Sequence, residues 1–256
     1  MPKIEITRDG PVTVITLNRP EVHNCVDAET AVALASAILS FADDPIARVL
    51  VVTGAGSMAF CSGADLKAAA GLLAHPFVNV AGPMGFARLD PGKPTIAAVN
   101  GYCFAGGMEL ASWCDFRIAS ANAEFGALNR RWGVPFTDGG TQRFARLCGQ
   151  GNALYLMETG VRLDALRAKE IGLVQEIVAR GAALDRALEL AHRIAAYPQS
   201  SLRADRRAAL EGLGRDLTSG LAIEAEICVP TVADPELALG LERFASGDRP
   251  EAPRPA

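Results

Sequence analysis

The sequence lacks the features that would place it at once in a secreted, membrane or metal-binding class. Its six cysteines stand far apart, with no Cys-x-x-Cys pair and no histidine at a metal-ligand spacing, so we expect a reducing compartment and no structural metal. No apolar run approaches the roughly 18 residues that a membrane-spanning helix needs. The first residues, Met1 to Glu5, lack the apolar stretch of a signal peptide. We therefore expect a cytoplasmic protein that is not bound to the membrane.

A long basic stretch is also missing. The formal net charge is -4, which argues against nucleic acid as a partner. Two short basic clusters, Arg130-Arg131 and the group Arg203, Arg206 and Arg207, are typical of solvated helix faces. Hydrophobic residues make up 50% of the 256 residues, so the chain can bury a substantial core, as one large domain or two small ones.

No complete nucleotide-binding or hydrolase motif is present. The run from Gly54 to Ala59 follows a predicted strand and fits Gly-x-Gly-x-x-Gly/Ala. A dinucleotide-binding turn opens a helix, whereas a second glycine-rich turn follows here, and no acid lies between Asp65 and Asp90. There is no Gly-Lys-Ser/Thr motif and no Gly-x-Ser-x-Gly elbow. We therefore reject nucleotide binding of the Rossmann type.

The pattern that is present predicts an α/β core. An alternating segment, Ile4 to Arg8, is followed by the hairpin signal Asp9-Gly10 and by a second strand up to Leu17. A helix capped by Asp27 and a continuous apolar strand at 49–52 come next. Further strands at about 95–99 and 115–119 complete a β-α-β order.

The second half of the chain is predicted to be mostly helical. Short helices are expected at 139–147, 152–158 and 166–171, a strand at 173–178, and an amphipathic helix at 184–195. The segment 71–94 is rich in Gly and Pro, and we expect a variable or mobile loop near the site. Further helices and a fraying Pro-rich tail are expected at the C-terminus.

Gly106-Gly107-Met108-Glu109 opens a predicted helix in the stretch 100–110, which follows the 95–99 strand. Glycines at a helix start let a ligand oxygen approach unpaired backbone N–H groups at the positive end of the helix dipole. Glu109, three residues after Gly106, is expected near the same face. A carboxylate beside such a donor suits proton transfer at a carbon next to a carbonyl. The alternative is a tightly packed helix start followed by a solvated glutamate.

Ser62-Gly63-Ala64-Asp65-Leu66 supplies a second candidate donor. Asp65 can cap the helix that begins there, and Gly63 permits a tight turn that leaves the N–H of Ala64 free. The N–H groups of Ala64 and Gly106 together would form an oxyanion hole, although helix capping alone explains either segment.

These segments resemble the enoyl-CoA hydratase/isomerase (crotonase) superfamily in order and spacing. The resemblance extends over about residues 4–200 and rests on the segments Asn18-Arg19-Pro20, 51–56, Phe60 to Lys67, 93–101, Gly106 to Leu110, 114–119, Phe125-Gly126, Gly139 to Arg143 and 168–174. It implies an α/β crotonase fold, a spiral core of ββα units at 1–195 with a C-terminal helical trimerisation region at 196–256.

The resemblance also implies a substrate and a chemistry. The substrate is an acyl-CoA thioester, as in fatty acid metabolism, and the intermediate is an enolate held by the N–H groups of Ala64 and Gly106. No cofactor is implied, because coenzyme A is part of the substrate. The assembly implied is a homotrimer or a dimer of trimers. Coenzyme A contacts and acyl-group contacts are expected at Glu21, Val22, His23, Ser62, Asp65, Leu66, Asn129 and Trp132.

The sequence departs from the hydratase pattern at the second catalytic glutamate. That position is Asn129 here, and an amide orients a water or a carbonyl but does not exchange a proton at neutral pH. Asp138 follows in a segment, Val134 to Thr141, that differs from the family's Ile-Pro-Gly-Ala-Gly-Gly-Thr. Asp138 is either a helix N-cap or a partial replacement for the missing carboxylate. Trp132 and Phe136 are expected to narrow or desolvate the pocket and so raise a nearby carboxyl pKa.

Three functions follow from this pattern. The first is an enoyl-CoA hydratase with Glu109 as the main acid/base and Asp138 as a possible second. The second is a double-bond isomerase that uses Glu109, Asp138 or both. The third, from another class, is a non-catalytic acyl-CoA binder.

Overall fold

A computed structural model describes residues 2–74 and 81–248. Its larger sheet has six strands in the order β1-β2-β3-β5-β7-β10. β1 and β2 form the predicted antiparallel hairpin, and every other neighbouring pair in this sheet is parallel. The strands are β1 (Ile4–Asp9), β2 (Val12–Leu17), β3 (Val49–Gly54), β5 (Thr95–Val99), β7 (Phe116–Ser120) and β10 (Glu176–Val178).

A second, smaller sheet has the order β4-β6-β8-β9. Its strands are β4 (Ala59–Cys61), β6 (Tyr102–Phe104), β8 (Glu124–Gly126) and β9 (Arg162–Asp164). Each has three residues, which is too short to show a two-residue period, and the sequence did not predict them. β4, β6 and β8 run parallel to one another, so their carboxyl ends meet at one edge of the sheet.

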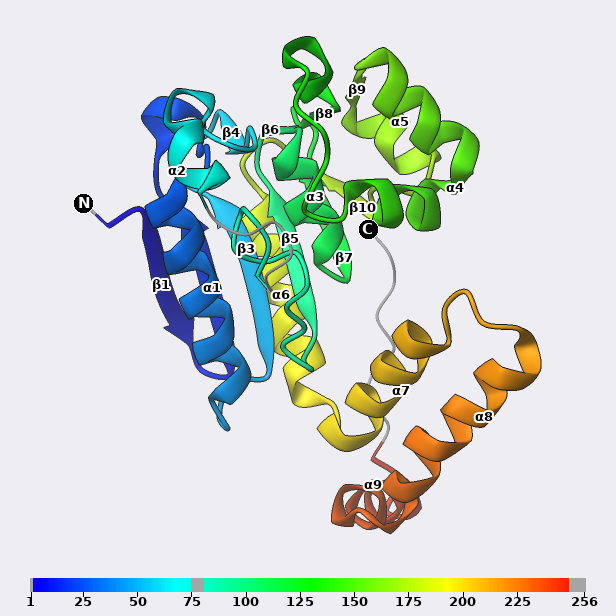
Figure 1. Cartoon of the computed structure of the whole chain (residues 1–256). Helices are drawn as coiled ribbons and strands as arrows, with labels where there is room; N and C mark the ends of the chain where they lie inside the picture. Colours follow the sequence, from blue (N-terminus) through cyan, green and yellow to red (C-terminus); the bar gives the residue numbers. More distant parts are fainter. Residues whose placement is uncertain (1, 75–80, 249–256) are drawn as a thin grey trace.

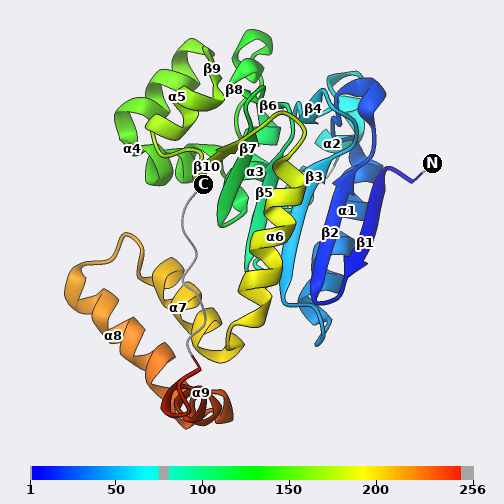
Figure 2. The same ribbon diagram turned by 180° about the vertical axis from the view of Figure 1, so that it is seen from behind.

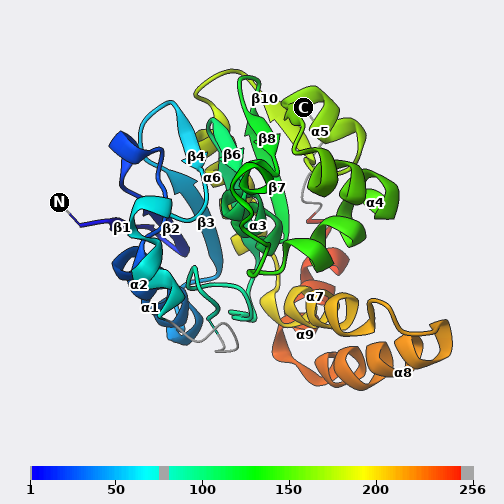
Figure 3. The ribbon, with the colours of Figure 1, turned by 45° about the horizontal axis from the view of Figure 1, so that its top comes forward.

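The chain alternates between the two sheets as it winds. β3 is followed by β4 and α2 (Ala69–Leu73), β5 by β6 and α3 (Gly106–Trp113), and β7 by β8 and α4 (Gly140–Thr159). Three successive ββα turns therefore form the spiral that the family resemblance implied. Figure 3 shows α3 in the middle of the core, with α1 (Ala28–Asp43) and α2 on one side and α4 and α5 (Ala165–Glu170) on the other.

Helices cover both faces of the larger sheet. α6 (Ala183–Ala196) lies against the face opposite α1 (Figure 2) and buries alanines at every fourth position. These small side chains, Ala183, Ala187, Ala191 and Ala195, let α6 approach Val12, Val49 and Ile96 closely. The other face of the sheet packs under α1, α3 and α4, and this is where the larger core lies.

Several predicted boundaries were correct and others shifted. The side chain of Asp27 caps α1 by accepting the N–H of Thr30, as expected. The two helices predicted at 139–147 and 152–158 run on as α4, with a local break where Gly149 has φ 77°. β10 begins only at Glu176, because the N–H groups of Leu173 and Val174 both donate to the carbonyl of Ala168 at the end of α5.

The segment after α2 is irregular, as predicted, but residues 81–89 are packed rather than loose. Met84 and Phe86 are buried, and Gly85, with φ +87°, lies directly against the backbone of Ala31 in α1. Residues 75–80 of the predicted mobile loop lie outside the described residues, and so does most of the predicted Pro-rich tail, residues 249–256.

Three further helices extend away from the core (Figure 1): α7 (Gln199–Gly212), α8 (Leu217–Cys228) and α9 (Pro235–Ala245). α8 and α9 bury none of their residues. Arg206 of α7 is not the solvated residue that was expected, because it forms ion pairs with Asp115 and Asp90, each at 2.9 Å. These pairs tie the base of the extension to the core. No helix in the described part of the chain is long and apolar enough to cross a membrane.

Candidate active site

The first candidate donor lies directly after β4. Val26 and Ala64 form an isolated parallel bridge in which Val26 N–H donates to Gly63 and Asp65 N–H donates to Val26. Successive N–H groups of an extended segment point to opposite sides, so the N–H of Ala64 points away from Val26. Within the described residues nothing accepts that N–H. The predicted donor is therefore available to a ligand.

The second donor lies after β6, beside the first. Ala105 adopts φ 49° and ψ -121°, a region that residues other than glycine rarely occupy. Its N–H donates to Gly126 and its carbonyl accepts from Met108 and Glu109, so the strained turn is held on both sides. Because the carbonyl of Ala105 points into α3, the N–H of Gly106 on the same peptide plane points the other way. That N–H also has no acceptor among the described residues.

Gly63 brings the two donors together. Its φ is +93°, and a β-carbon there would lie 2.8 Å from the backbone nitrogen of Gly106 and 3.1 Å from the β-carbon of Ala105. Only glycine fits this close approach without strain. A β-carbon on Gly106 would in turn collide with the sulfur of Met84. The sequence signal for this arrangement was the Gly-containing turn in each segment.

Both donor segments border a cavity of about 320 Å³. Eight of the predicted site residues line it: Ser62, Ala64, Leu66, Gly106, Glu109, Asn129, Trp132 and Asp138. Leu72, Met84 and Phe136 add apolar surface. A largely apolar cavity with a few converging polar groups is the usual form of a small-molecule site.

Glu109 is buried in the first turn of α3, with 3% of its surface exposed. Its Oε1 atom accepts the N–H groups of Asp138 at 2.9 Å and Gly140 at 2.8 Å. The other carboxyl oxygen, Oε2, has no hydrogen-bond partner among the described residues. Burial raises the pKa of Glu109 to about 8, and the two N–H groups only partly oppose this. One oxygen is thus anchored while the other is left for proton exchange.

Asp138 is not the N-cap of α4. The N-cap is Gly139, with no side-chain capping bond. The Asp138 carboxylate instead accepts the N–H of Met84 at 3.1 Å and the hydroxyl of Thr137 at 3.3 Å. Burial raises its pKa. Asp138 lines the cavity beside Glu109. Its carboxylate also holds the loop that contains Met84 in place.

Asn129 and Trp132 differ in their exposure. Asn129 is buried, and its Nδ2 donates to the carbonyl of Val134 at 2.7 Å. This bond fixes the amide orientation and leaves the buried Oδ1 without a partner in the described part of the chain. Trp132 lines the cavity but is 71% exposed. The expectation that it desolvates the pocket is therefore wrong.

The predicted coenzyme A contacts divide into two groups. Ser62 and Leu66 line the cavity, whereas Glu21, Val22 and His23 lie outside its lining on a neighbouring loop. That loop is attached by the hydrogen bond from Ser62 N–H to the His23 carbonyl. Glu21 and His23 are exposed, which leaves them accessible to a ligand that extends out of the cavity.

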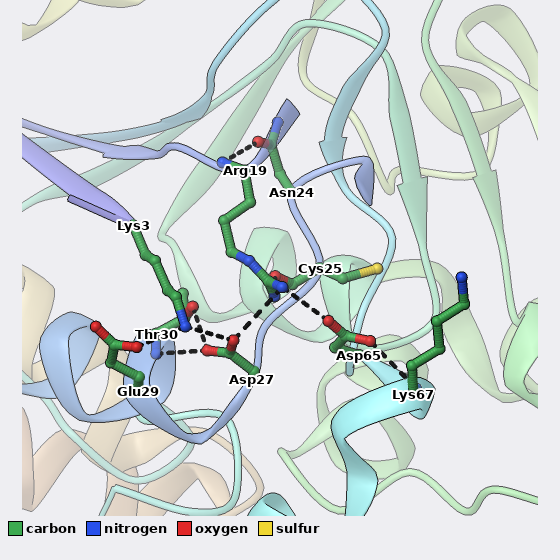
Figure 4. A network of polar contacts seen from close by, with 9 residues as sticks. All are labelled: Lys3, Arg19, Asn24, Cys25, Asp27, Glu29, Thr30, Asp65 and Lys67. Carbon is green, nitrogen blue, oxygen red and sulfur yellow. Dashed lines mark hydrogen bonds and ion pairs between the residues drawn. The ribbon is translucent and has the colours of Figure 1, made fainter. Parts of the chain in front are cut away.

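The side chain of Asp65 is engaged within the protein. It accepts from the N–H of Lys67 at 3.1 Å and from the guanidinium of Arg19 at 2.8 Å (Figure 4). Arg19 also donates to the carbonyl of Cys25 and lies 3.4 Å from Asp27. The carboxylate of Asp65 thus connects the two loops. Its backbone is engaged as well, because its N–H donates to Val26 and its carbonyl accepts the N–H of Ala68.

Sequence reasoning missed two residues that shape the site. Arg143 donates to the carbonyls of Asp138 and Ala87, so it joins the loops on both sides of the cavity wall. The sequence feature that could have indicated Arg143 is its place in the first turn of a helix that begins beside the site. Met84 lies under Gly106, and no pattern in the irregular segment 81–94 indicated it.

Comparisons with known proteins agree with this geometry. A family model for enoyl-CoA hydratase/isomerase matches residues 7–251. Crotonyl-CoA hydratase from Syntrophomonas wolfei subsp. wolfei is 35% identical over 226 residues, 87% of each chain. Carnitinyl-CoA dehydratase from Salmonella paratyphi A is 41% identical over 195 residues, 75% of this chain and 74% of the relative.

Solved structures give the same result. The crystal structure of an enoyl-CoA hydratase from Mycobacterium marinum matches 98% of both chains with a TM-score of 0.91 and 34% sequence identity. The family model, the curated relatives and this structure together extend over both the core and the C-terminal helices. The chain therefore belongs to the enoyl-CoA hydratase/isomerase family.

Proposed function

We propose that this protein is an enoyl-CoA hydratase, a lyase that adds water across the α,β double bond of an acyl-CoA thioester. The observation that carries this is the free Oε2 of Glu109 in the same cavity as two unpaired N–H groups, those of Ala64 and Gly106. The relatives named hydratase and dehydratase support the same reaction class. Coenzyme A enters as part of the substrate, and the proposal includes no cofactor.

The reaction begins with the thioester carbonyl accepting both N–H groups. A water held by Oε2 of Glu109 gives its proton to the carboxylate while its oxygen bonds to the β-carbon. The electrons of the double bond move to the thioester oxygen, and the enolate is held by Ala64 and Gly106. One such donor is typically worth about 3–4 kcal/mol of barrier. Glu109 then returns the proton to the α-carbon, so the net change is the addition of one water.

Asp138 is proposed as a second acid/base in this reaction. It borders the cavity next to Glu109, and burial raises its pKa toward the range useful for proton exchange. Asn129 retains a buried acceptor but has no group that gains or loses a proton near neutral pH, so it can only orient the water or the substrate. Glu109 takes the leading role because its Oε2 is free, whereas both Asp138 oxygens already accept hydrogen bonds.

A kinetic panel tests the proposed function. Purified protein is mixed with trans-2-enoyl-CoA esters of several chain lengths, and the products are identified by mass as the ester plus one water. We expect 3-hydroxyacyl-CoA from the wild type and a loss of about a thousandfold or more with Glu109→Gln. If calorimetry detects binding of the esters while no ester is converted, the protein is a binder and the proposal is wrong.

A double-bond isomerase is the second candidate, and Asn129 at the second glutamate position favours it. Isomerisation needs only a proton moved between the α- and γ-carbons, which one or two carboxylates accomplish without water. Deuterium exchange at both carbons in D₂O, with no 3-hydroxyacyl-CoA formed, would identify this activity. Exchange at the α-carbon together with hydroxyacyl product would identify the hydratase.

We also propose that the protein assembles as a homotrimer or a dimer of trimers through residues 196–256. α9 exposes a stripe of large apolar side chains, Leu237, Leu241 and Phe244, at the spacing of one helix face. Such a surface is costly for a monomer to leave in water.

A further inference from the structure

A second cavity, of about 570 Å³, lies behind the candidate active site. It is bordered by the carboxyl end of α3, the first turns of α4 and the end of α7, with Trp113, Leu147, Leu210 and Leu213 among its lining residues. It shares two residues with the cavity that contains Glu109: Phe136 and Thr137 border both. The two spaces are therefore separated by a wall that is thin at this point.

Phe136 is held in that wall by its contacts. Its ring meets the ring of Phe144 edge to face, with centroids 5.2 Å apart and an interplanar angle of 86°. Phe144 is fully buried, so the contact anchors Phe136 to the core. A β-carbon on Gly140 would lie 3.0 Å from both Phe136 Cδ1 and Glu109 Cγ. The ring of Phe136 is thus a close neighbour of the Glu109 side chain.

The size of the first cavity limits what fits between the oxyanion hole and this wall. At about 30 Å³ for a water-sized group, 320 Å³ holds on the order of ten such groups. The thioester and the adjoining end of the pantetheine arm occupy part of this space, which leaves room for an acyl group of about four to six carbons.

We propose that Phe136 closes the acyl cavity and restricts this enzyme to short acyl groups, and that removing its ring would admit longer chains into the second cavity. This inference rests on the proposed function. Three of the charged groups bordering the second cavity have partners: Arg143 donates to Asp138 and Ala87, Asp115 is paired with Arg206, and Arg146 donates to Gln142. The buried hydroxyl of Ser112 has no partner in the described part of the chain. The surface left for a chain includes Trp113, Leu147, Leu210 and Leu213, which suits an alkyl group.

The test measures kcat/KM for trans-2-enoyl-CoA esters from four to twelve carbons. The wild type is expected to convert the shortest esters best and to lose activity steeply beyond about six carbons. Phe136→Ala is expected to raise kcat/KM for the ten- and twelve-carbon esters by about tenfold or more, since even one methylene in a pocket is worth about tenfold or more. The milder Phe136→Leu should shift the limit by fewer carbons and covers the case in which Phe136→Ala does not fold.

A control tests whether the new chain length uses the second cavity. Leu210 borders only that cavity, so Leu210→Trp alone should leave conversion of the four-carbon ester unchanged. Combined with Phe136→Ala, it should remove the gain on the long esters. A wild type that converts long esters as well as short ones, or a Phe136→Ala or Phe136→Leu profile that matches wild type, would overturn the inference. Absence of turnover with every ester would instead refute the proposed function.

Discussion

Glu109 lies between two helix starts, in the first turn of α3 and against the N–H groups of Asp138 and Gly140, where the chain enters α4. Burial favours its neutral form, and the N–H groups of Asp138 and Gly140 favour its ionised form. Burial is the stronger effect, so its pKa lies at about 8. A carboxyl whose pKa is near the working pH can both take and return a proton, which is what hydration requires.

The first prediction concerns stability and pH. The native protein keeps Glu109 protonated up to about pH 8, whereas the unfolded chain releases this proton near 4.5. Between these values the native state binds more protons, so stability falls as pH rises, by about 1.4 kcal/mol per pH unit from this group. The Glu109→Gln variant has no carboxyl at this position, so its stability does not fall with pH in this way. Urea unfolding at pH 5 and pH 8 should therefore show a stability advantage of Glu109→Gln that grows with pH, and an advantage independent of pH would contradict the assigned pKa.

The second prediction concerns Gly63. Gly63→Ala places a β-carbon 2.8 Å from the Gly106 nitrogen, in a backbone conformation with φ +93°. We expect kcat to fall by about a hundredfold or more, because a donor is displaced from the thioester oxygen.

The matched control for Gly63 is Gly92→Ala. Gly92 also has a positive φ, +66°, but an added β-carbon meets nothing within 4 Å. The Gly92→Ala variant should lose about 1–3 kcal/mol in its free energy of unfolding through backbone strain and keep the wild-type kcat. Equal losses of kcat in the two variants, with folding checked by circular dichroism, would mean that Gly63 acts only through the fold.

At this scale the sequence predicted that the segments of Ala64, Gly106 and Glu109 come together, and they line one cavity. It did not predict the partners of Asp138. The donors follow from glycines beside helix starts, a local pattern. The Met84–Asp138 bond joins residues 54 positions apart, and nothing in the irregular segment around Met84 signals it. The N-cap interpretation of Asp138 was wrong because α4 begins one residue later, with Gly139 as its N-cap, and the Asp138 carboxylate is turned to Met84 and Thr137.

At the scale of elements, α3 is fixed at both ends. Its first turn carries Gly106, the proposed oxyanion donor. Its last carbonyls lie against the buried guanidinium of Arg117, which donates to Cys114 at 3.0 Å and to Ala111 at 3.4 Å. Arg117 also donates to Leu173 and to Gln175. A cation at a helix C-terminus is favourable to the helix dipole, so this arginine supports the element that holds Glu109.

The third prediction concerns the loop that contains Ala64. Arg19 joins Cys25, Asp27 and Asp65 across two loops (Figure 4), and its side chain is 14% exposed. Arg19→Met leaves nearby carboxylates poorly compensated. We expect a loss of about 3–5 kcal/mol in the free energy of unfolding, together with a lower kcat, because the Ala64 segment loses its anchor.

Lys3→Met is the control for Arg19. Lys3 pairs with Asp27 and Glu29 at the outer edge of the same network and is twice as exposed, at 28%. Its loss should cost about 1 kcal/mol or less and leave kcat unchanged. Urea unfolding and steady-state kinetics of both variants test this. Similar losses of stability in the two would show that the network is not centred on Arg19.

The long strands and helices could be predicted because their periods are visible over six or more residues, as in β2 and α6. The smaller sheet could not, since three residues do not define a period. Its strands are set by pairing with neighbours more than twenty residues away, for example Tyr102 with Glu124. The packed segment 81–89 was expected to be mobile because its Gly and Pro content hides buried Phe86 and Met84.

At the scale of the whole molecule, the core buries its apolar side chains, whereas α8 and α9 at the C-terminus leave theirs exposed. α8 and α9 bury no residue within the described chain, yet Leu217, Leu221 and Leu241 expose more than half of their surface. The family resemblance implied a trimerisation region here, and that role stays a prediction.

The fourth prediction is therefore that the wild type in solution has a mass three or six times 26.9 kDa. Replacing Leu237 and Leu241 by Glu should give a smaller species, because charges on the apolar stripe oppose its burial. Glu242→Gln, on the same helix, should keep the wild-type mass. Light scattering coupled to size-exclusion chromatography measures this, and a monomeric wild type would refute the assembly.

The central claim is that Glu109 is the group that moves the proton at this site. The pH dependence of kcat/KM for a short trans-2-enoyl-CoA, followed by loss of the conjugated thioester, tests it most directly. The carboxylate form starts the reaction, so kcat/KM should rise with an apparent pKa near 8, and Glu109→Gln should lose about a thousandfold or more across the range. A Glu109→Gln variant that hydrates the ester at the wild-type rate would contradict the claim.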